Sequence, residues 1–240
     1  MRRLLVLAAC FVAAGFGQSN DCDSVESCQK VLEANRRSSL AHYRVGEIFF
    51  QQGHIQAAAN EFRSALDGDL DPGWIEVWSH ISLGNIFGAT GQTDRAANEY
   101  RLAQRVKGNS PGVLHARGSG DQIYTCDGSE WALSGPDAKL FDEAGNQVGS
   151  HFAGPTWQWM DGSQVKGKPV ANVTLDAESI PWLLLTATDH MGDGVMKNVL
   201  SIQRLRTSGG KAPASGCDAA HKDEKTRVHY TADYYFYTVR

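Results

Sequence analysis

The chain has 240 residues, with 23 Lys and Arg against 27 Asp and Glu, for a formal net charge of -4. Hydrophobic residues make up 42% and charged residues 21%, which is ordinary for a folded globular protein and excludes a largely disordered chain. The basic residues are scattered, whereas a nucleic-acid binder needs a concentrated basic surface to displace counterions. We therefore expect no nucleic-acid partner.

The first seventeen residues predict a secretory signal peptide. Arg2 and Arg3 form a positive start, Leu4–Phe16 is almost entirely apolar, and small residues follow. The apolar run of about 13 residues is too short to cross a hydrocarbon core of about 30 Å. Cleavage after Gly17 would leave Gln18 as the first residue of a secreted or periplasmic protein with no transmembrane span.

Two alternatives remain open for this segment. Leu7-Ala8-Ala9-Cys10 resembles a bacterial lipobox, so the protein is lipid-anchored through Cys10 if that cysteine is acylated. The second alternative is that the segment is not exported and forms a short buried helix at the start of the helical repeats. The arginine pair and the small residues at its end favour export.

Export would leave four cysteines, Cys22, Cys28, Cys126 and Cys217. An even count in an exported chain indicates disulfides, and four cysteines allow three pairings. Segregation along the chain favours Cys126–Cys217, with Cys22–Cys28 as a local clip. A zinc site needs closely spaced ligand pairs, which these spacings do not supply, so we predict no metal site.

The amino-terminal half contains an internal repeat. One constant shift along the chain superimposes two segments that each read as helix, glycine break and helix. The matching pairs are His42 and His80, Val45 and Leu83, Gly46 and Gly84, Phe49 and Phe87, Gly53 and Gly91, Ala58 and Ala96, Phe62 and Tyr100, and Ala65 and Ala103. We predict about two and a half helical hairpins over residues 18–108, with Glu26–Asn35 as the half hairpin.

These residues resemble the tetratricopeptide (TPR) repeat over about residues 22–107, although the family's usual period, about 34 residues, is shorter than the one found here. The resemblance implies a groove lined by residues of the first helix of each hairpin. Two readings of that groove stay open, a binding surface for a protein or peptide and a surface packed against the chain's own second domain. The implied lining residues are Tyr43, Glu47, Phe50, Trp78, Ile81 and Asn85.

The second half changes pattern. Residues 109–120 are rich in glycine and read as a linker, and residues 121–240 show short strand-like runs separated by turn residues. Asp161-Gly162 is a strong hairpin signal. The prediction is an α+β protein in separate domains, with amino-terminal helical hairpins and a carboxyl-terminal all-β sandwich or barrel.

Six phrases of this half resemble, in the same order, an uncharacterised domain family, DUF3455. The resemblance covers about residues 112–240 and implies no established activity. The phrases lie at residues 122–126, 151–157, 180–185, 201–205, 216–221 and 230–237.

Candidate ligand-binding side chains also lie in this half. His151, His190 and His221 are the histidines that an acid–base or ligand site would use, and Trp157 and Trp159 project from one strand face, suited to stacking on a saccharide or a small molecule. The alternative is that the histidines are structural and the aromatic residues form the core. No nucleophile elbow, zinc motif or dinucleotide-binding loop is present, so we predict no catalytic residue and no cofactor.

Three functions remain as hypotheses. The first is an exported, non-enzymatic interaction protein that binds a protein or peptide through its helical repeats, with a β domain of unknown ligand. The second is a hydrolase-type enzyme with its site around His151 and His190. The third is a structural component of the cell envelope.

Overall fold

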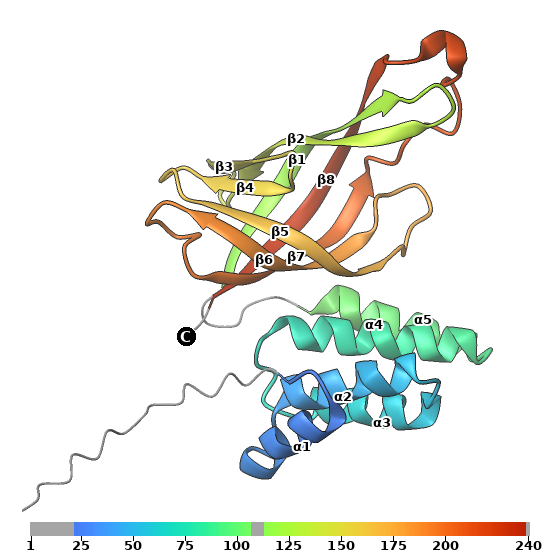
Figure 1. Cartoon of the computed structure of the whole chain (residues 1–240), viewed down its shortest axis with the longest axis vertical. Coiled ribbons are helices and arrows are strands. Elements are labelled where there is room, and N and C mark those ends of the chain that lie inside the picture. Colours follow the sequence, from blue (N-terminus) through green and yellow to red (C-terminus); the bar gives the residue numbers. More distant parts are fainter. Residues whose placement is uncertain (1–21, 107–112, 239–240) are drawn as a thin grey trace, which may run out of the picture.

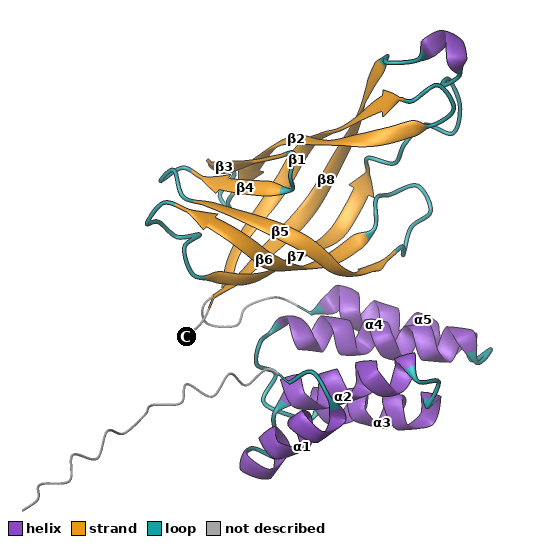
Figure 2. Ribbon diagram, viewed as in Figure 1, coloured by secondary structure: helices purple, strands orange, loops and turns teal. Residues whose placement is uncertain are grey.

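The computed structural model describes residues 22–106 and 113–238. The predicted signal peptide and Cys10 lie outside these ranges. The described residues form a helical layer and a barrel of strands, which lie one above the other in Figure 1 and are separated by colour in Figure 2. This division confirms the predicted α+β fold class.

The described amino-terminal part consists of five α-helices: α1 (Val25–Ala34), α2 (Ser39–Gln51), α3 (Ile55–Leu66), α4 (Trp74–Ala89) and α5 (Thr93–Arg105). The pairs α2–α3 and α4–α5 are the two hairpins of the internal repeat, and α1 precedes them as the half hairpin. None of the described helices is long and apolar enough to cross a membrane.

The strands of the described carboxyl-terminal part form a closed antiparallel barrel in sequence order, with β1 pairing to β8. Of the two β architectures predicted, the structure adopts the barrel. The strands are β1 (Val113–Cys126), β2 (Trp131–Phe141), β3 (Gln147–Phe152), β4 (Thr156–Trp159), β5 (Gln164–Val173), β6 (Trp182–Met191), β7 (Val199–Gly209) and β8 (Lys225–Thr238).

Successive side chains of a strand point to opposite faces, and here the two faces belong to two different hydrophobic cores. On β8, Tyr234 and Phe236 point into the barrel, where they pack with Trp157. The intervening Tyr235 and Tyr237 point outward and join the helical core instead. One strand therefore contributes its two faces to two different cores, and the barrel is attached to the helices through its outer surface.

The linker prediction needs correction. β1 begins at Val113, so residues 113–120 belong to the barrel. Their glycines indicate close packing, because a Cβ on Gly118 would lie 2.5 Å from the Tyr234 ring and one on Gly120 would meet the backbone of β2 at Ala138. Sequence composition alone does not distinguish such glycines from those of a linker.

The two hairpins repeat the same contacts. A Cβ on Gly46 would lie 2.8 Å from the ring of Phe62, and one on Gly84 would lie 2.5 Å from the ring of Tyr100. These glycines therefore let the two helices of each hairpin approach closely. The turns repeat as well, since Gly53 has φ +79° and its counterpart Gly91 has φ +75°.

A histidine–glutamate pair joins the two helices of each hairpin and is the second contact that repeats. His42 Nδ1 lies 2.7 Å from Glu61 Oε2, and His80 Nδ1 lies 2.7 Å from Glu99 Oε2. The hydrogen bond with Glu61 raises the pKa of His42, against the opposing effect of partial burial. Both the histidine and the glutamate of this pair recur at the same spacing as the other matched positions.

The loop between the two hairpins packs against the start of α2. Residues 67–73 turn back onto the start of α2, where the buried hydroxyl of Ser39 donates to the Ala65 carbonyl at 2.7 Å and accepts from the Leu70 N–H at 2.8 Å. The Asp69 carboxylate accepts from the Ser39 N–H at 3.1 Å. These residues thus form an ordered connection between the two hairpins.

Two glycines of α4 make opposite predictions. Gly84→Ala is expected to lower the free energy of unfolding by about 1–3 kcal/mol, because the new methyl group would press on the Tyr100 ring, which is held by a hydrogen bond to Asn85. Gly88→Ala is expected to raise it by roughly 0.5–1 kcal/mol, because the nearest atom, the Ala96 Cβ, is 3.9 Å away and alanine favours a helix. Urea unfolding followed by circular dichroism measures both changes. Equal effects of the two substitutions would contradict the close crossing of α4 and α5.

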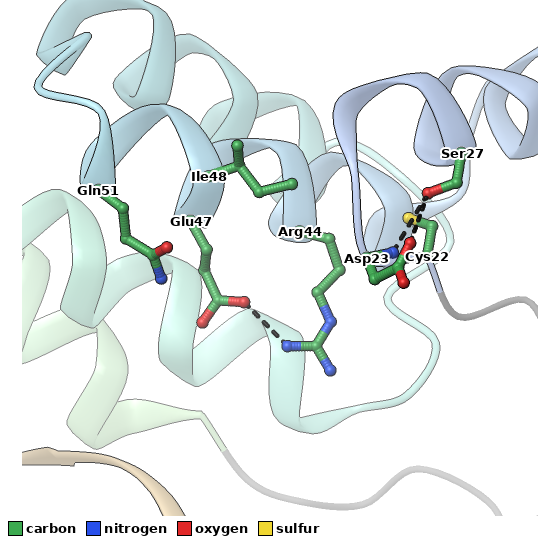
Figure 3. Close-up of a pocket in the computed structure, with 7 residues that line it drawn as sticks. All are labelled: Cys22, Asp23, Ser27, Arg44, Glu47, Ile48 and Gln51. Atoms are coloured by element: carbon green, nitrogen blue, oxygen red, sulfur yellow. Dashed lines mark hydrogen bonds and ion pairs between the residues drawn. The ribbon is translucent and has the colours of Figure 1, made fainter.

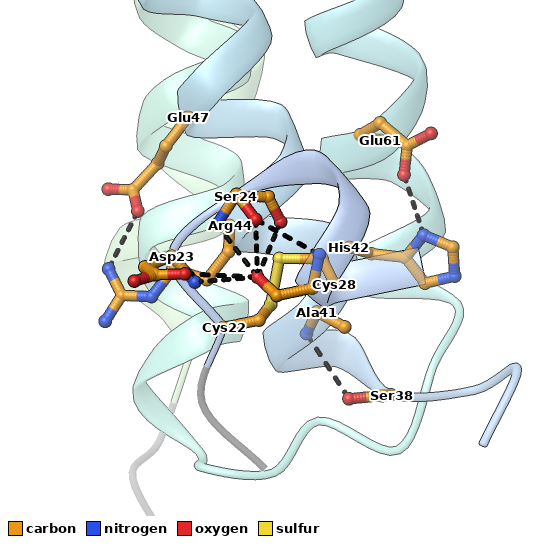
Figure 4. Close-up of a disulfide and its surroundings, with 11 residues drawn as sticks. Cys22, Asp23, Ser24, Cys28, Ser38, Ala41, His42, Arg44, Glu47 and Glu61 are labelled. Atoms are coloured by element: carbon orange, nitrogen blue, oxygen red, sulfur yellow. Dashed lines mark hydrogen bonds and ion pairs between the residues drawn. A yellow bond between two sulfur atoms is a disulfide. The ribbon is translucent and has the colours of Figure 1, made fainter. Parts of the chain in front are cut away.

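Both predicted disulfides are present. Cys22–Cys28 has its Cα atoms 5.0 Å apart and clips the chain to α1, and Cys126–Cys217 has them 5.3 Å apart. Figure 4 shows the first of these beside Ser24, whose side chain caps α1. Cys28 is fully buried in a small core with residues of α2, so the clip closes the free end of the helical layer.

Candidate binding groove between the helices and the barrel

The residues implied as groove-lining by the resemblance to the tetratricopeptide repeat lie together in the structure. They line one cavity of about 140 Å³, where α2 and α4 face β5 of the barrel. The complete lining is Tyr43, Glu47, Phe50, Gln51, Phe62, Trp78, Ile81, Ser82, Asn85, Ala171 and Asn172. We call this space the junction cavity.

Helical spacing explains this convergence. Tyr43, Glu47 and Phe50 follow one another at intervals of four and three residues, so they share one face of α2. The lining residues of α4 have a similar spacing and share one face of that helix. The two faces meet because α2 and α4 are the first helices of successive hairpins.

The cavity has a buried floor and an open mouth. Tyr43, Trp78 and Ile81 are at most 2% exposed, whereas Phe50 is 40% exposed. Tyr43 packs edge-on to Trp74 with ring centroids 5.1 Å apart, and its burial raises the pKa of its hydroxyl well above the usual value. The phenol is therefore a neutral hydrogen-bonding group at physiological pH.

The barrel covers part of this face. Trp182 and Leu184 of β6 belong to the same buried core as Trp78 and Ile81. The buried amide of Gln203 on β7 donates to the Trp74 carbonyl at 3.3 Å. The same amide accepts a hydrogen bond from the Tyr237 hydroxyl at 2.6 Å. Packing against the chain's own second domain thus accounts for the floor of the cavity and leaves its mouth accessible.

A larger and more polar hollow adjoins the mouth. It has a volume of about 550 Å³, and Figure 3 shows its lining residues along α2 and at the start of α1. Arg44 Nη1 lies 2.9 Å from Glu47 Oε2 within it. Glu47 and Gln51 line both hollows, so the two form one groove along α2 that ends at the Cys22–Cys28 clip.

Of the candidate ligand residues in the barrel, His151 and Trp157 are brought together. Their rings stack at 4.3 Å with an interplanar angle of 4°, and both are buried inside the barrel. The Nδ1 of His151 lies 2.9 Å from the Thr156 carbonyl. Burial lowers the pKa of His151 to about 3, so the ring is neutral at physiological pH. These contacts are those of a core pair.

The other three candidates are spread over the barrel. Trp159 is half-buried against Phe236, and the exposed His190 has its Nε2 2.8 Å from the Val199 carbonyl. His221 pairs with Asp218 at 2.7 Å on an exposed 3-10 turn. Within residues 22–106 and 113–238, no group of His, Cys, Asp and Glu side chains has the arrangement of a metal site.

One polar cluster is not apparent from the sequence. On the outer face of the barrel, Asp233 lies 3.4 Å from His115 and 2.6 Å from Arg206, and Arg206 also donates to the Tyr235 hydroxyl. Burial opposes ionisation of Asp233, but the adjacent His115 and the hydrogen bond from Arg206 outweigh it and hold its pKa below the usual value. His115 lies in the segment predicted as a linker, which concealed the cluster.

The described residues thus form an eight-stranded barrel, cross-linked by a disulfide, that packs against helical hairpins. Residues 107–238 match the family described as "Protein of unknown function (DUF3455)", and the chain belongs to this family. The match confirms the resemblance carried by the six phrases of the second half. No curated protein matches the chain.

Proposed function

We propose that this protein is an exported interaction protein whose helices form a TPR-like array and bind a segment of a partner protein in the groove along α2. The observation that carries the proposal is the convergence of six side chains on one cavity with an open mouth. The resemblance of the helical half to the tetratricopeptide repeat implies all six as groove-lining, independently of any contact in the structure. They are Tyr43, Glu47, Phe50, Trp78, Ile81 and Asn85.

Two features support export. Two disulfides are characteristic of proteins that mature in an oxidising compartment. The amino-terminal sequence has the pattern of a signal peptide. Secretion or periplasmic residence, with lipid attachment at Cys10 as the alternative, is therefore part of the proposal.

The hydrolase hypothesis receives less support from the barrel. A general base acts best when its pKa lies near the working pH, whereas burial lowers the pKa of His151 to about 3. The ring of His151 stacks on Trp157, and its Nδ1 bonds the Thr156 carbonyl, so its surroundings are those of a structural residue. An interaction role through the helices accounts for more of the observed geometry.

Site-specific crosslinking in the source cells tests the proposal. A photoreactive benzoylphenylalanine in place of Phe50, at the mouth, is expected to capture one defined partner. The same residue in place of Asn98, exposed on α5, is the control. The partner is then purified, and its binding is expected to weaken at least tenfold with Glu47→Arg, which reverses a charge common to both hollows. Equal capture at both positions, or binding indifferent to Glu47→Arg, would reject the groove.

A further inference from the structure

Resting on this proposed function, we infer that the junction cavity accepts the phenyl ring of a phenylalanine residue carried by the partner segment. The volume is the first argument. An apolar cavity of roughly 150 Å³ holds one benzene molecule. The junction cavity has about 140 Å³, which suits a single six-membered ring and is small for an indole.

The chemistry of the floor is the second argument. Tyr43, Phe62 and Trp78 are each 2% exposed and present aromatic surface to the cavity. Aromatic rings pack favourably edge to face, so this floor favours an aromatic guest over an aliphatic one of equal size.

The charge of the cavity lining argues against a lysine or arginine of the partner as the residue that enters the cavity. The only charged side chain that lines the cavity, within the described ranges, is Glu47. Its carboxylate is already paired with Arg44 at 2.9 Å. A lysine or arginine from the partner would have to lose its hydration in a space whose acid is engaged, whereas a neutral ring has no such cost.

The mouth suits a peptide on either side of the ring. Gln51, Asn85 and Asn172 are exposed around Phe50 and carry amide groups that donate and accept hydrogen bonds. Such side chains match the polar groups of an extended backbone. The site therefore combines one apolar anchor position with a rim for main-chain contacts.

The test uses N-acetyl-phenylalanine amide as the probe and N-acetyl-alanine amide as the control, with the full mature chain labelled at isoleucine methyl groups. The phenylalanine probe is expected to shift the Ile81 methyl resonance in a saturable manner and to leave that of Ile202, inside the barrel, unchanged. Equal shifts with both probes, or no shift of Ile81, would overturn the inference.

Two variants make the test specific. Ala171→Leu, which fills the cavity from β5, is expected to weaken the phenylalanine probe at least tenfold, and Ala132→Leu, at an exposed position of β2, is expected to leave its affinity unchanged. Ile81→Ala enlarges the cavity and is expected to shift preference toward a naphthylalanine probe, read from the Trp78 indole N–H resonance. Unchanged affinity in Ala171→Leu would overturn the inference even if crosslinking at Phe50 succeeds, in which case the groove binds its partner without this anchor.

Discussion

Replacement of both Cys126 and Cys217 by serine is expected to lower the free energy of unfolding of the barrel by about 4 to 5 kcal/mol. The disulfide joins residues 91 positions apart, and in the chain-entropy model a loop of that length gives a cross-link a stabilisation of this size. It ties the end of β1 to the long connection between β7 and β8. Denaturant unfolding of the oxidised protein and of the variant, followed by tryptophan fluorescence, measures the difference.

The other disulfide is the matched control. Cys22 and Cys28 are only 6 positions apart, so the same model gives about 2.2 kcal/mol for their replacement by serine. The effect is expected in the helical layer, where Cys28 packs against Ala41 and Val45. If the short clip proved as stabilising as the long one, loop length would not be what sets the contribution of Cys126–Cys217.

Acidification is expected to destabilise the protein through His151 by about 3 kcal/mol between pH 7 and pH 4. The pKa of His151 is about 3 in the folded state and near 6.5 when the chain is unfolded. Between these values the unfolded state binds a proton that the folded state does not, so stability rises with pH across this window and is lost as pH falls. Urea unfolding at intervals of half a pH unit gives the slope.

His151→Gln is the control for this slope. It removes the titrating ring and keeps an amide able to donate to the Thr156 carbonyl, so the variant is less stable at pH 7 but has a flatter dependence on pH. Nitrogen chemical shifts of the His151 ring provide an independent measurement, and we expect no titration above pH 4 in the folded protein. A titration midpoint near 6.5 would show that the ring is accessible to water, contrary to its burial.

The helical half was largely predictable because its signals are local. Glycine at the crossings and turns, and an aromatic residue to fill each crossing, recur at one fixed spacing, and each is explained by a contact with a near neighbour in the sequence. Helical spacing also predicted which side chains share a face, whereas the choice of that face as a groove lining came from the resemblance to the tetratricopeptide repeat. The disulfides followed from the number and distribution of the cysteines.

The second half was less predictable because its decisive contacts are distant in sequence. Closure of the barrel depends on pairing between β1 and β8, its first and last strands, and no local pattern separates that arrangement from a sandwich. Gly118 and Gly120 read as linker residues until the strands beside them are known. The contact of His115 with Asp233 depends on the same closure and was missed for the same reason.

The outward-facing side chains of β6 and β8 determine what is expected when the two parts of the chain are expressed as separate fragments. Trp182 and Tyr235 would become water-exposed in a fragment that starts the barrel at Val113 without the helices. A fragment that ends after the helices, at residue 108, would lose the apolar neighbours that the barrel supplies. The boundary between helices and strands is therefore a change of secondary structure only. Neither part is expected to fold as an independent domain, because each covers an apolar surface of the other.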